Sequence, residues 1–584
     1  MLVALLSIAH PAYFHATASA ATAAATCPPS ISFGETIQCS IVTAEIDSYT
    51  FTGTAGDIVV VRAGADDGTL RPALRLLGPG GTSLCTASNP YGPMVEIAAC
   101  TLSSSGTFTI QISDSSGTRS GSYSLYLQRL NGAGNTNPLD AGQTATGSIL
   151  IAAEMDAYTF AGSAGDRVVI RMGTSNGTLR SQLRLYRSDG VKICEGGNPY
   201  GLAGEIGTCV LTQSGNYMLL VSNASDVRTG TYGLSIQRVT QPANATNLPF
   251  AQSTVAAILG AGEIDTYTFA TTSSTTILLK GATASGTLRP HLRIFGAEGT
   301  LICEGGASYS DTAEISSCVL GQPGTYTLLV NDHSDVRTGT YNLYLQRLIN
   351  PVNPKALGIG QHASGSIGTS GEVATYTFTV PAQSVMTARA GAANSSVRPY
   401  LRVYTPQGNK VCEAGTSYSE TIEMTTCALT DGGTYTLLLN DFGGPRTGNY
   451  GLQIQTFKDP IRAGTLTSGR TLTTAIAAAG EFHTYTFTAT ASDKILLRVS
   501  ATNGMLRPYV RLHTESGAKL CEAGTSYGAV AEITSCTIPS TGRFVVITND
   551  YGASRTGTYT IFFQNLTSPG SPALQYAYIP VVRY

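Results

Sequence analysis

Paired cysteines are the most regular chemically reactive residues of this sequence. Five pairs have members fifteen residues apart, and each pair begins 109 residues after the last: Cys85/Cys100, Cys194/Cys209, Cys303/Cys318, Cys412/Cys427 and Cys521/Cys536. The other two of the twelve cysteines, Cys27 and Cys39, lie together near the start of the first copy. An even number of locally paired cysteines predicts six disulfides in an oxidising compartment. A zinc site is not favoured, because the Cys-x-x-Cys knuckle is absent and no histidine recurs beside the pairs.

A hydrolase-like motif occurs once, at Gly524-Thr-Ser-Tyr-Gly528. The Gly-x-Ser-x-Gly nucleophile elbow needs a strand, a sharp turn and a helix, whereas this copy of the motif lies in the loop between two paired cysteines. Proline replaces Ser526 at the equivalent positions 90 and 199. No His-Glu-x-x-His occurs, and no histidine recurs at one position in all copies, so a catalytic base is lacking. We therefore expect no enzyme activity and no catalytic residue.

Arginine, glutamate and tyrosine also recur with the 109-residue period. Two arginines four residues apart occur in each copy, and an exposed-looking tyrosine follows in the cysteine loop: Arg71, Arg75 and Tyr91; Arg180, Arg184 and Tyr200; Arg289, Arg293 and Tyr309; Arg398, Arg402 and Tyr418; Arg507, Arg511 and Tyr527. The recurring glutamates are Glu96, Glu205, Glu314, Glu423 and Glu532. One interpretation is a cross-strand ion pair on the sheet surface. The other is a ligand face for a glycan or an acidic polymer, since aromatic faces stack on sugars and guanidinium groups bind hydroxyls and carboxylates.

Clustered carboxylates provide a weaker candidate for a calcium site. Glu154 with Asp156, and Glu263 with Asp265, place hard oxygen ligands near the start of a predicted strand. The fourth and fifth copies have Ala374 and His483 in place of the second carboxylate. We therefore expect no cofactor common to all copies, with calcium as an alternative in individual ones.

The elements that carry these residues are predicted to be strands. In the second copy, period-two alternation indicates eight: residues 144–150, 156–161, 167–172, 179–186, 191–195, 204–211, 216–222 and 231–239. In the fourth strand of the third copy, Leu288, Leu292 and Ile294 should face the core while Arg289 and Arg293 face solvent. The fold class is therefore all-β, with five tandem jelly-roll-like two-sheet sandwiches.

A repeat of this length suits a domain with its own core. We predict a signal peptide at residues 1–26, domains at 27–131, 139–240, 249–349, 356–457 and 464–566, and a C-terminal tail at 567–584. The linkers are rich in Pro and Asn, which predicts semi-extended spacers and an array of separate beads.

Composition narrows the class of partner. Charged residues make up 12 % of the chain and the net charge is −2, so a nucleic-acid or anionic-membrane partner has no electrostatic support. An apolar run at residues 2–8 and small residues around Ala18 and Ala20 are typical of an export signal. No later apolar stretch is long enough to span a membrane.

The order of short motifs resembles the bacterial pre-peptidase C-terminal domain. In the second copy these motifs are Tyr158-Thr-Phe, Ala164-Gly-Asp, the strand at 179–186, Asp189-Gly, Ser214-Gly-Asn-Tyr and Gly230-Thr-Tyr-Gly-Leu, and the resemblance covers all five copies. It implies a secreted jelly-roll-like sandwich without catalysis of its own, which occurs appended to extracellular hydrolases or in arrays. The paired cysteines depart from most members, and no hydrolase is attached here.

These observations predict a secreted or cell-surface, non-catalytic, monomeric array. It would act as a spacer or an adhesive element that binds extracellular polysaccharide, cell wall or matrix protein weakly at several sites. The alternative is a targeting or accessory component of an extracellular peptidase or glycan-hydrolase system.

Overall fold

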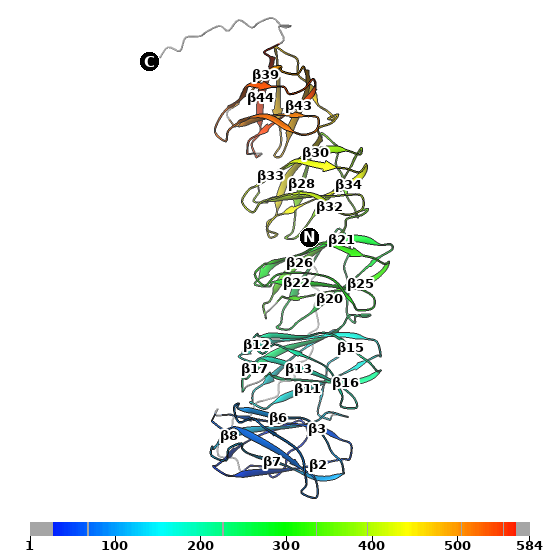
Figure 1. The fold of residues 1–584 in the computed structure, drawn as a ribbon, viewed down its shortest axis with the longest axis vertical. Helices are drawn as coiled ribbons and strands as arrows, with labels where there is room; N and C mark the ends of the chain where they lie inside the picture. Colours follow the sequence, from blue (N-terminus) through cyan, green and yellow to red (C-terminus); the bar gives the residue numbers. More distant parts are fainter. Residues whose placement is uncertain are drawn as a thin grey trace, which may run out of the picture. The chain divides into compact units, whose positions relative to one another are not determined.

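The computed structural model describes residues 27–567 except 67–68, 133, 225–226, 334–335, 394, 504 and 553. The predicted signal peptide and residues 568–584 of the predicted tail lie outside the described residues. The described residues form strands and turns without helices, grouped into five modules of two sheets each (Figure 1). The prediction of five all-β sandwiches is therefore confirmed. Within this part of the chain, no helix has the length and apolarity needed to cross a membrane.

The first two modules have these strands. Module 1 contains β1 (Glu35–Ile41), β2 (Ile46–Gly53), β3 (Ile58–Ala65), β4 (Pro72–Leu77), β5 (Ser83–Ser88), β6 (Met94–Thr101), β7 (Gly106–Asp114) and β8 (Gly121–Arg129). Module 2 contains β9 (Asn137–Pro138), β10 (Gln143–Ile149), β11 (Met155–Gly162), β12 (Arg167–Gly177), β13 (Ser181–Arg187), β14 (Lys192–Gly197), β15 (Ala203–Val210), β16 (Gly215–Asn223) and β17 (Gly230–Arg238). All eight strands predicted in the second copy are present.

The last three modules repeat the pattern of module 2. Module 3 contains β18 (Thr246–Asn247), β19 (Ser253–Ile258), β20 (Asp265–Thr271), β21 (Thr275–Gly286), β22 (Pro290–Phe295), β23 (Leu301–Gly305), β24 (Thr312–Leu320), β25 (Gly324–Asp332) and β26 (Gly339–Arg347). Module 4 contains β27 (Lys355–Ala356), β28 (His362–Ile367), β29 (Ala374–Val380), β30 (Ser384–Ala392), β31 (Pro399–Tyr404), β32 (Lys410–Ala414), β33 (Thr421–Leu429), β34 (Gly433–Asp441) and β35 (Gly448–Thr456). Module 5 contains β36 (Gly464–Thr465), β37 (Arg470–Ile476), β38 (Phe482–Ala489), β39 (Lys494–Ala501), β40 (Pro508–Thr514), β41 (Lys519–Gly524), β42 (Val530–Thr537), β43 (Gly542–Asp550) and β44 (Gly557–Asn565).

Each module consists of a leading sheet and a trailing sheet, names that we use throughout. In module 2 the leading sheet has the order β14-β13-β16-β11-β9 and the trailing sheet the order β10-β17-β12-β15. The corresponding leading sheets are β2-β7-β4-β5 in module 1, β18-β20-β25-β22-β23 in module 3, β27-β29-β34-β31-β32 in module 4 and β36-β38-β43-β40-β41 in module 5. The corresponding trailing sheets are β1-β8-β3-β6, β19-β26-β21-β24, β28-β35-β30-β33 and β37-β44-β39-β42.

The core of each module lies between its two sheets. In module 2, Val168 and Ile170 on β12 and Leu183 and Leu185 on β13 are buried together with the tyrosine Tyr232 on β17. These residues alternate with outward-facing ones because successive side chains of a strand point to opposite faces. The inward residues predicted for the fourth strand of module 3 are buried as expected: Leu292 and Ile294 on β22, and Leu288 just before it.

All six predicted disulfides are present. Within a module the cysteine pair joins an edge strand of the leading sheet to an edge strand of the trailing sheet; in module 2, Cys194 lies on β14 and Cys209 on β15. The bond therefore closes the sandwich along one edge. In module 1, Cys27–Cys39 also attaches the residues before β1 to that strand.

The second cysteine of each fifteen-residue pair is also a core residue, which the spacing alone did not indicate. Its first partner is only partly buried in every module, as Cys194 is in module 2. The second cysteines are at most 1 % exposed, and cysteine is among the residue types most often fully buried: Cys100, Cys209, Cys318, Cys427 and Cys536. Each of these bonds therefore anchors the edge of the leading sheet directly to the hydrophobic core, instead of joining two surface positions.

The described chain divides into two compact units, one around module 1 and one containing modules 2 to 5. Within the second unit, neighbouring modules pack directly on each other. Apolar side chains are shared at each junction: Val169, Val239, Phe295 and Leu329 between modules 2 and 3; Leu278, Leu348, Val373 and Tyr404 between modules 3 and 4; Phe457, Phe482, Val545 and Ile547 between modules 4 and 5. The prediction of separate beads is therefore wrong for modules 2 to 5.

The linkers explain this difference. Thr246 and Asn247, in the predicted spacer between modules 2 and 3, form the short strand β18 and pair in parallel with β20. The linker is thus part of the next module's leading sheet. Glycine also permits modules 2 and 3 to pack closely. A Cβ on Gly262 of module 3, whose φ is +75°, would lie 2.5 Å from the carbonyl oxygen of Gly233 in module 2.

Candidate functional site

The loop inside each disulfide presents one tyrosine to solvent. Tyr91, Tyr200, Tyr309, Tyr418 and Tyr527 are between 85 % and 92 % exposed. In module 2 the loop joins β14 to β15, and the Asn198 side chain accepts hydrogen bonds from the backbone N–H groups of Tyr200 and Gly201 at 3.0 and 2.8 Å. In module 4 the Thr416 hydroxyl accepts from the Tyr418 N–H at 3.0 Å. These side-chain turns hold the loop so that its ring points away from the sandwich.

The first arginine of each pair is only partly exposed. The backbone N–H groups of Arg289, Arg398 and Arg507 donate to the carboxylates of Asp332, Asp441 and Asp550, at 2.8 to 2.9 Å. The Arg398 guanidinium also donates to the backbone oxygen of Ser417, beside Tyr418. In module 1 the Arg71 N–H donates to Asp114 at 3.2 Å. Burial alone would raise the pKa of Asp114, but hydrogen bonds from Ser116 and from several backbone N–H groups outweigh burial and lower this pKa to about 2. In module 4 the first arginine thus contacts the loop that carries the exposed tyrosine.

The second arginine of each pair does not face solvent in modules 2 to 5, and this prediction is wrong there. Arg184, Arg293, Arg402 and Arg511 are at most 6 % exposed, whereas Arg75 in module 1 is exposed. The alternation along the strand is as expected, and these side chains do point away from the core of their own module. In modules 3, 4 and 5, however, the preceding module covers the outer face of the leading sheet. Arg293, Arg402 and Arg511 therefore cannot belong to an exposed ligand face with the tyrosines.

These buried arginines form ion triads across the junctions. Glu205 binds Arg171 of its own module at 3.5 Å and Arg293 of the next module at 2.5 Å. Glu314 joins Lys280 to Arg402, and Glu423 joins Arg389 to Arg511. The inner cation also donates to a backbone oxygen across the junction, as Arg171 does to Asp332 at 2.7 Å. The predicted surface ion pair is thus a buried bridge between modules.

At the junction of modules 4 and 5, the two arginines of the triad favour the ionised form of its glutamate. Burial alone would raise the pKa of the Glu423 carboxyl, but the positive charges of Arg511 and Arg389 outweigh burial and hold this pKa below its ordinary 4.5. The Arg511 guanidinium is further satisfied by Asn549, which accepts a hydrogen bond at 2.9 Å. Because the pKa of Glu423 is lower in the folded state, its ionised carboxylate stabilises the fold above pH 4.5. This contribution is lost as the pH falls through the folded-state pKa.

Sequence reasoning missed one member of each triad. Arg62, Arg171, Lys280, Arg389 and Arg498 also recur every 109 residues, each between two apolar or small residues of a trailing-sheet strand. A cation inside such a strand is a signal for a buried partner, because ionised groups are buried only when paired.

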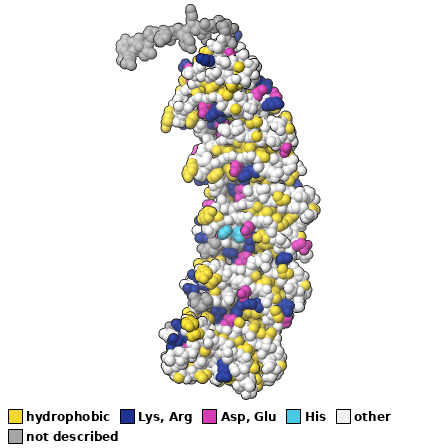
Figure 2. Space-filling model, in the orientation of Figure 1, with side chains coloured by type: hydrophobic (Ala, Val, Ile, Leu, Met, Phe, Trp, Pro, Cys, Tyr) yellow, Lys and Arg dark blue, Asp and Glu magenta, His cyan; other side chains and the backbone are white. Residues whose placement is uncertain are grey.

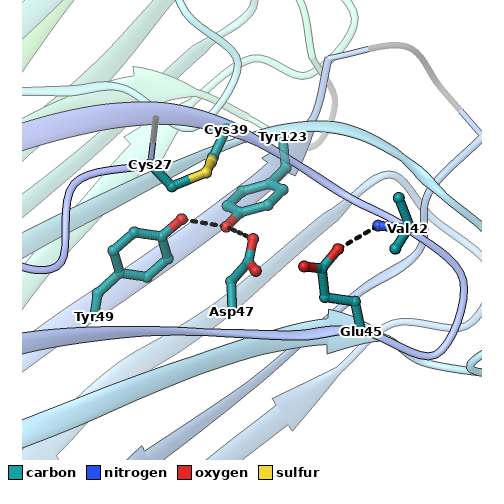
Figure 3. Close-up of a disulfide and its surroundings, with 7 residues drawn as sticks. All are labelled: Cys27, Cys39, Val42, Glu45, Asp47, Tyr49 and Tyr123. Atoms are coloured by element: carbon teal, nitrogen blue, oxygen red, sulfur yellow. Dashed lines mark hydrogen bonds between the residues drawn. A yellow bond between two sulfur atoms is a disulfide. The ribbon is translucent and has the colours of Figure 1, made fainter. Parts of the chain in front are cut away.

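The calcium candidates lie in a recurring network of tyrosines and carboxylates, which Figure 3 shows for module 1. There the Tyr123 hydroxyl donates a hydrogen bond to Asp47 at 2.6 Å and forms another with the hydroxyl of Tyr49. Both bonds lie close to the Cys27–Cys39 disulfide. Asp156 and Asp265 accept in the same way from Tyr232 and Tyr341, each at 2.5 Å. In module 5, His483 takes the place of the carboxylate and bonds the Tyr559 hydroxyl at 2.8 Å.

The glutamates of the calcium candidates have another role. Glu154 accepts from the Ile151 N–H at 3.1 Å, and Glu263 accepts from the N–H groups of Leu259 and Gly260 at 2.6 and 2.8 Å. These bonds close the turn before β11 or β20. Among the described residues, the grouping nearest to a metal-ligand set is Cys27, Cys39 and Asp47, whose two sulfurs are already joined in a disulfide.

Asp265 provides a pH-dependent test of this network. Burial raises the pKa of Asp265 from 3.8 to about 6; the hydrogen bond from Tyr341 opposes the rise and the charge of Glu263 adds to it. Between these two values the folded state holds a proton that the unfolded state lacks, so stability falls as the pH rises through 6. We expect Asp265→Asn to remove a decrease of roughly 1–3 kcal/mol between pH 4 and 7. Urea unfolding, monitored by hydrogen exchange in module 3, would measure this decrease. Module 4 has Ala374 at the equivalent position and is the internal control. Equal pH profiles in wild type and variant would contradict the prediction.

The hydrolase-like motif has no catalytic setting in the described residues. Ser526 lies in the loop between β41 and β42, among strands rather than at a strand-to-helix turn. No described histidine or carboxylate is hydrogen-bonded to its side chain.

Among the described residues, the face drawn in Figure 2 has no large patch of charges of one sign. On the face drawn in Figure 2, lysines and arginines lie near aspartates and glutamates in small groups, surrounded by uncharged surface. Such a surface does not favour a polyanionic partner.

Comparison with known proteins finds similarity at the level of the fold. No family model matches the chain, and no significant match is found among curated proteins. Among solved structures the chain is similar to the pre-peptidase C-terminal domain of collagenase from Bacillus anthracis, with 20 % identity and a TM-score of 0.16 over 18 % of this chain and 97 % of that one. It is also similar to the CUB1-EGF-CUB2 domains of rat MASP-1, with 9 % identity and a TM-score of 0.12 over 36 % of this chain and all of that one. A third similar structure contains the M60 catalytic domain with two CBM51 domains of Clostridium perfringens ZmpB, with 9 % identity and a TM-score of 0.12 over 89 % of this chain and 55 % of that one. One of these similar structures is a pre-peptidase C-terminal domain, the family that the sequence motifs resemble.

Proposed function

We propose that this chain is a secreted, non-catalytic extracellular protein that binds a polymer weakly at several equivalent sites, through its five loop tyrosines. The observation that carries the proposal is that one tyrosine in every module is almost fully exposed, on a loop closed by a disulfide. A large exposed aromatic ring offers apolar area and a hydroxyl at little cost in side-chain entropy, which suits contact with sugar rings or with a protein matrix.

The junctions support a multivalent mode of binding. In modules 2 to 5 the buried triads and apolar clusters fix one tyrosine loop relative to the next. Several weak sites raise the overall affinity only when they engage one target together, and fixed spacing favours targets whose binding groups repeat. The six disulfides are consistent with an extracellular location. The described residues thereby support an adhesive spacer, with insoluble polysaccharide, cell wall or collagen as candidate targets.

Retention on these three matrices tests the proposal. We expect oxidised protein to be retained on at least one of them, and replacement of all five tyrosines by alanine to reduce the apparent affinity by about 10²–10⁴-fold. A single Tyr309→Ala change should have a small effect, because four sites remain. Tyr551→Ala is the matched control, since Tyr551 is 46 % exposed and lies outside the disulfide loops.

Two results would contradict this function. Retention that is unchanged in the five-tyrosine variant would place binding elsewhere, and capture of a secreted hydrolase instead of a matrix would favour an accessory role. Turnover of casein or of a chromogenic glycan by the pure protein would refute the absence of catalysis.

A further inference from the structure

The three junctions within modules 2 to 5 are built from the same parts. At each one, the outer face of a trailing sheet meets the outer face of the next leading sheet. The trailing face supplies a glutamate and a cation, and the leading face supplies an arginine and an asparagine: Glu205, Arg171, Arg293 and Asn331; Glu314, Lys280, Arg402 and Asn440; Glu423, Arg389, Arg511 and Asn549. Modules 3, 4 and 5 thus each pack against the preceding module through the same set of contacts.

Two such faces have no partner among the described residues. The leading face of module 1 carries Arg75, which is equivalent to Arg293 and is exposed. No described residue forms a hydrogen bond or ion pair with its side chain. The trailing face of module 5 carries Glu532 and Arg498, 3.6 Å apart, and the Arg498 side chain is 53 % exposed, against 5 % to 7 % for Arg171, Lys280 and Arg389. Module 1 therefore carries one member of a triad, and module 5 carries the other two.

The apolar parts of the junction are exposed at the same two ends. Ile46 on module 1 is 59 % exposed, whereas the equivalent Val373 and Phe482 are 1 % and 2 % exposed. Leu566 on module 5 is 50 % exposed, whereas Val239, Leu348 and Phe457 are each 1 % exposed. A cleft of about 530 Å³ on the leading face of module 1 is bounded by Ile46, Arg75 and Gln111.

We propose that the leading face of module 1 binds the trailing face of module 5 in a second copy of this chain, so that copies associate head to tail. Arg75 of one copy would complete the triad with Glu532 and Arg498 of the other, and Ile46 and Leu566 would be covered together. The charges are complementary, and the contact continues the interface that the chain already repeats. Because the two faces differ, every added copy presents a new free face, and growth is open-ended. The sequence led us to expect a monomeric array, and this association would replace that expectation.

The contact between copies should be weaker than the junction between modules 4 and 5. Ser500 and Thr560 occupy the positions where module 4 has Gly391 and Gly451, and Ala44 takes the place of Gly480. A Cβ at Gly451 would lie 1.8 Å from the Ala479 carbonyl oxygen, so the larger residues hold the two faces further apart. Separate copies also lose translational freedom that tethered modules do not. We expect a dissociation constant between about 10 µM and 1 mM.

Sedimentation velocity of oxidised protein, residues 27–584, tests this proposal over a concentration series up to about 1 mM. The weight-average sedimentation coefficient should rise with concentration, and less so at high salt, because exposed charges are screened. Arg75→Glu and Glu532→Arg should each abolish the rise, and the double variant should recover part of it by exchanging the charges. Lys192→Glu is the control, since Lys192 is an exposed cation on β14 that belongs to neither end face. Far-UV circular dichroism would verify that every variant is folded.

A chain that stays monomeric at the highest concentration would overturn the proposal and identify the end faces as polar caps of the array. Association that persists in Arg75→Glu would overturn it as well, because another surface would then carry the contact. Both results are independent of matrix binding, since neither end face includes a loop tyrosine.

Discussion

Replacement of Glu423 by alanine should lower the free energy of unfolding at the junction of modules 4 and 5 by about 3–5 kcal/mol. Glu423 binds Arg389 at 2.5 Å and also binds Arg511, and both arginine side chains are almost completely buried. Removal of the carboxylate would leave two guanidinium groups close together without a counter-charge in a poorly solvated site. The change removes a single carboxylate, so its effect isolates the triad from the apolar cluster beside it.

Glu532→Ala is the matched control for this prediction. Glu532 occupies the same position in module 5, but its partner Arg498 is 53 % exposed, so we expect a loss of no more than about 1 kcal/mol. The chain contains no tryptophan, so urea unfolding would be followed by far-UV circular dichroism, and hydrogen exchange would assign the change to β30, β33 and β40. Equal losses in the two variants would show that the triads contribute no more than surface ion pairs.

Replacement of both Cys412 and Cys427 by serine should destabilise module 4 by about 3 kcal/mol, on the chain-entropy model for a loop of this length. The bond joins β32 of the leading sheet to β33 of the trailing sheet across a sequence separation of 15. Without it the covalent connection between β32 and β33 is the loop that carries Tyr418. Faster hydrogen exchange in β32 and β33, with unchanged exchange in module 2, would measure the effect and localise it.

The same variant links stability to binding. If the disulfide orders the Tyr418 loop in advance, its loss should also weaken matrix retention in a protein whose other four loop tyrosines are already alanine. A destabilisation below about 1 kcal/mol would contradict the chain-entropy account for this bond.

The local structure of each module could be predicted from the sequence. The strand expected at residues 216–222 corresponds to β16 (Gly215–Asn223), because its apolar residues form one short run that has turn residues on both sides. The strand expected at 167–172 extends instead to Gly177 in β12, since its polar end continues to pair with β17 after a register shift near Thr174. Periodicity identifies the buried face of a strand but does not show where the pairing ends.

The environment of the outward faces could not be predicted in the same way. Alternation placed Arg293 opposite the core, and this was right, but alternation contains no information about a neighbouring module that covers the outer face. Tyr309 and Arg293 recur equally, yet the tyrosine is exposed on a loop while the arginine is buried at a junction. Only contacts between residues 88 positions apart, such as Arg293 with Glu205, separate these two cases.

The repeated junction has a consequence for how such a gene can change. Modules 3 and 4 each carry a complete leading face and a complete trailing face. The residues that join these faces across a junction recur at a constant interval of sequence. Duplication or loss of one 109-residue segment by unequal recombination would therefore place matching faces against each other again, with the ion triad restored at the new boundary. Descendants of the gene could lengthen or shorten the protein in whole-module steps without new compensating mutations, and the number of tyrosine loops would change with it.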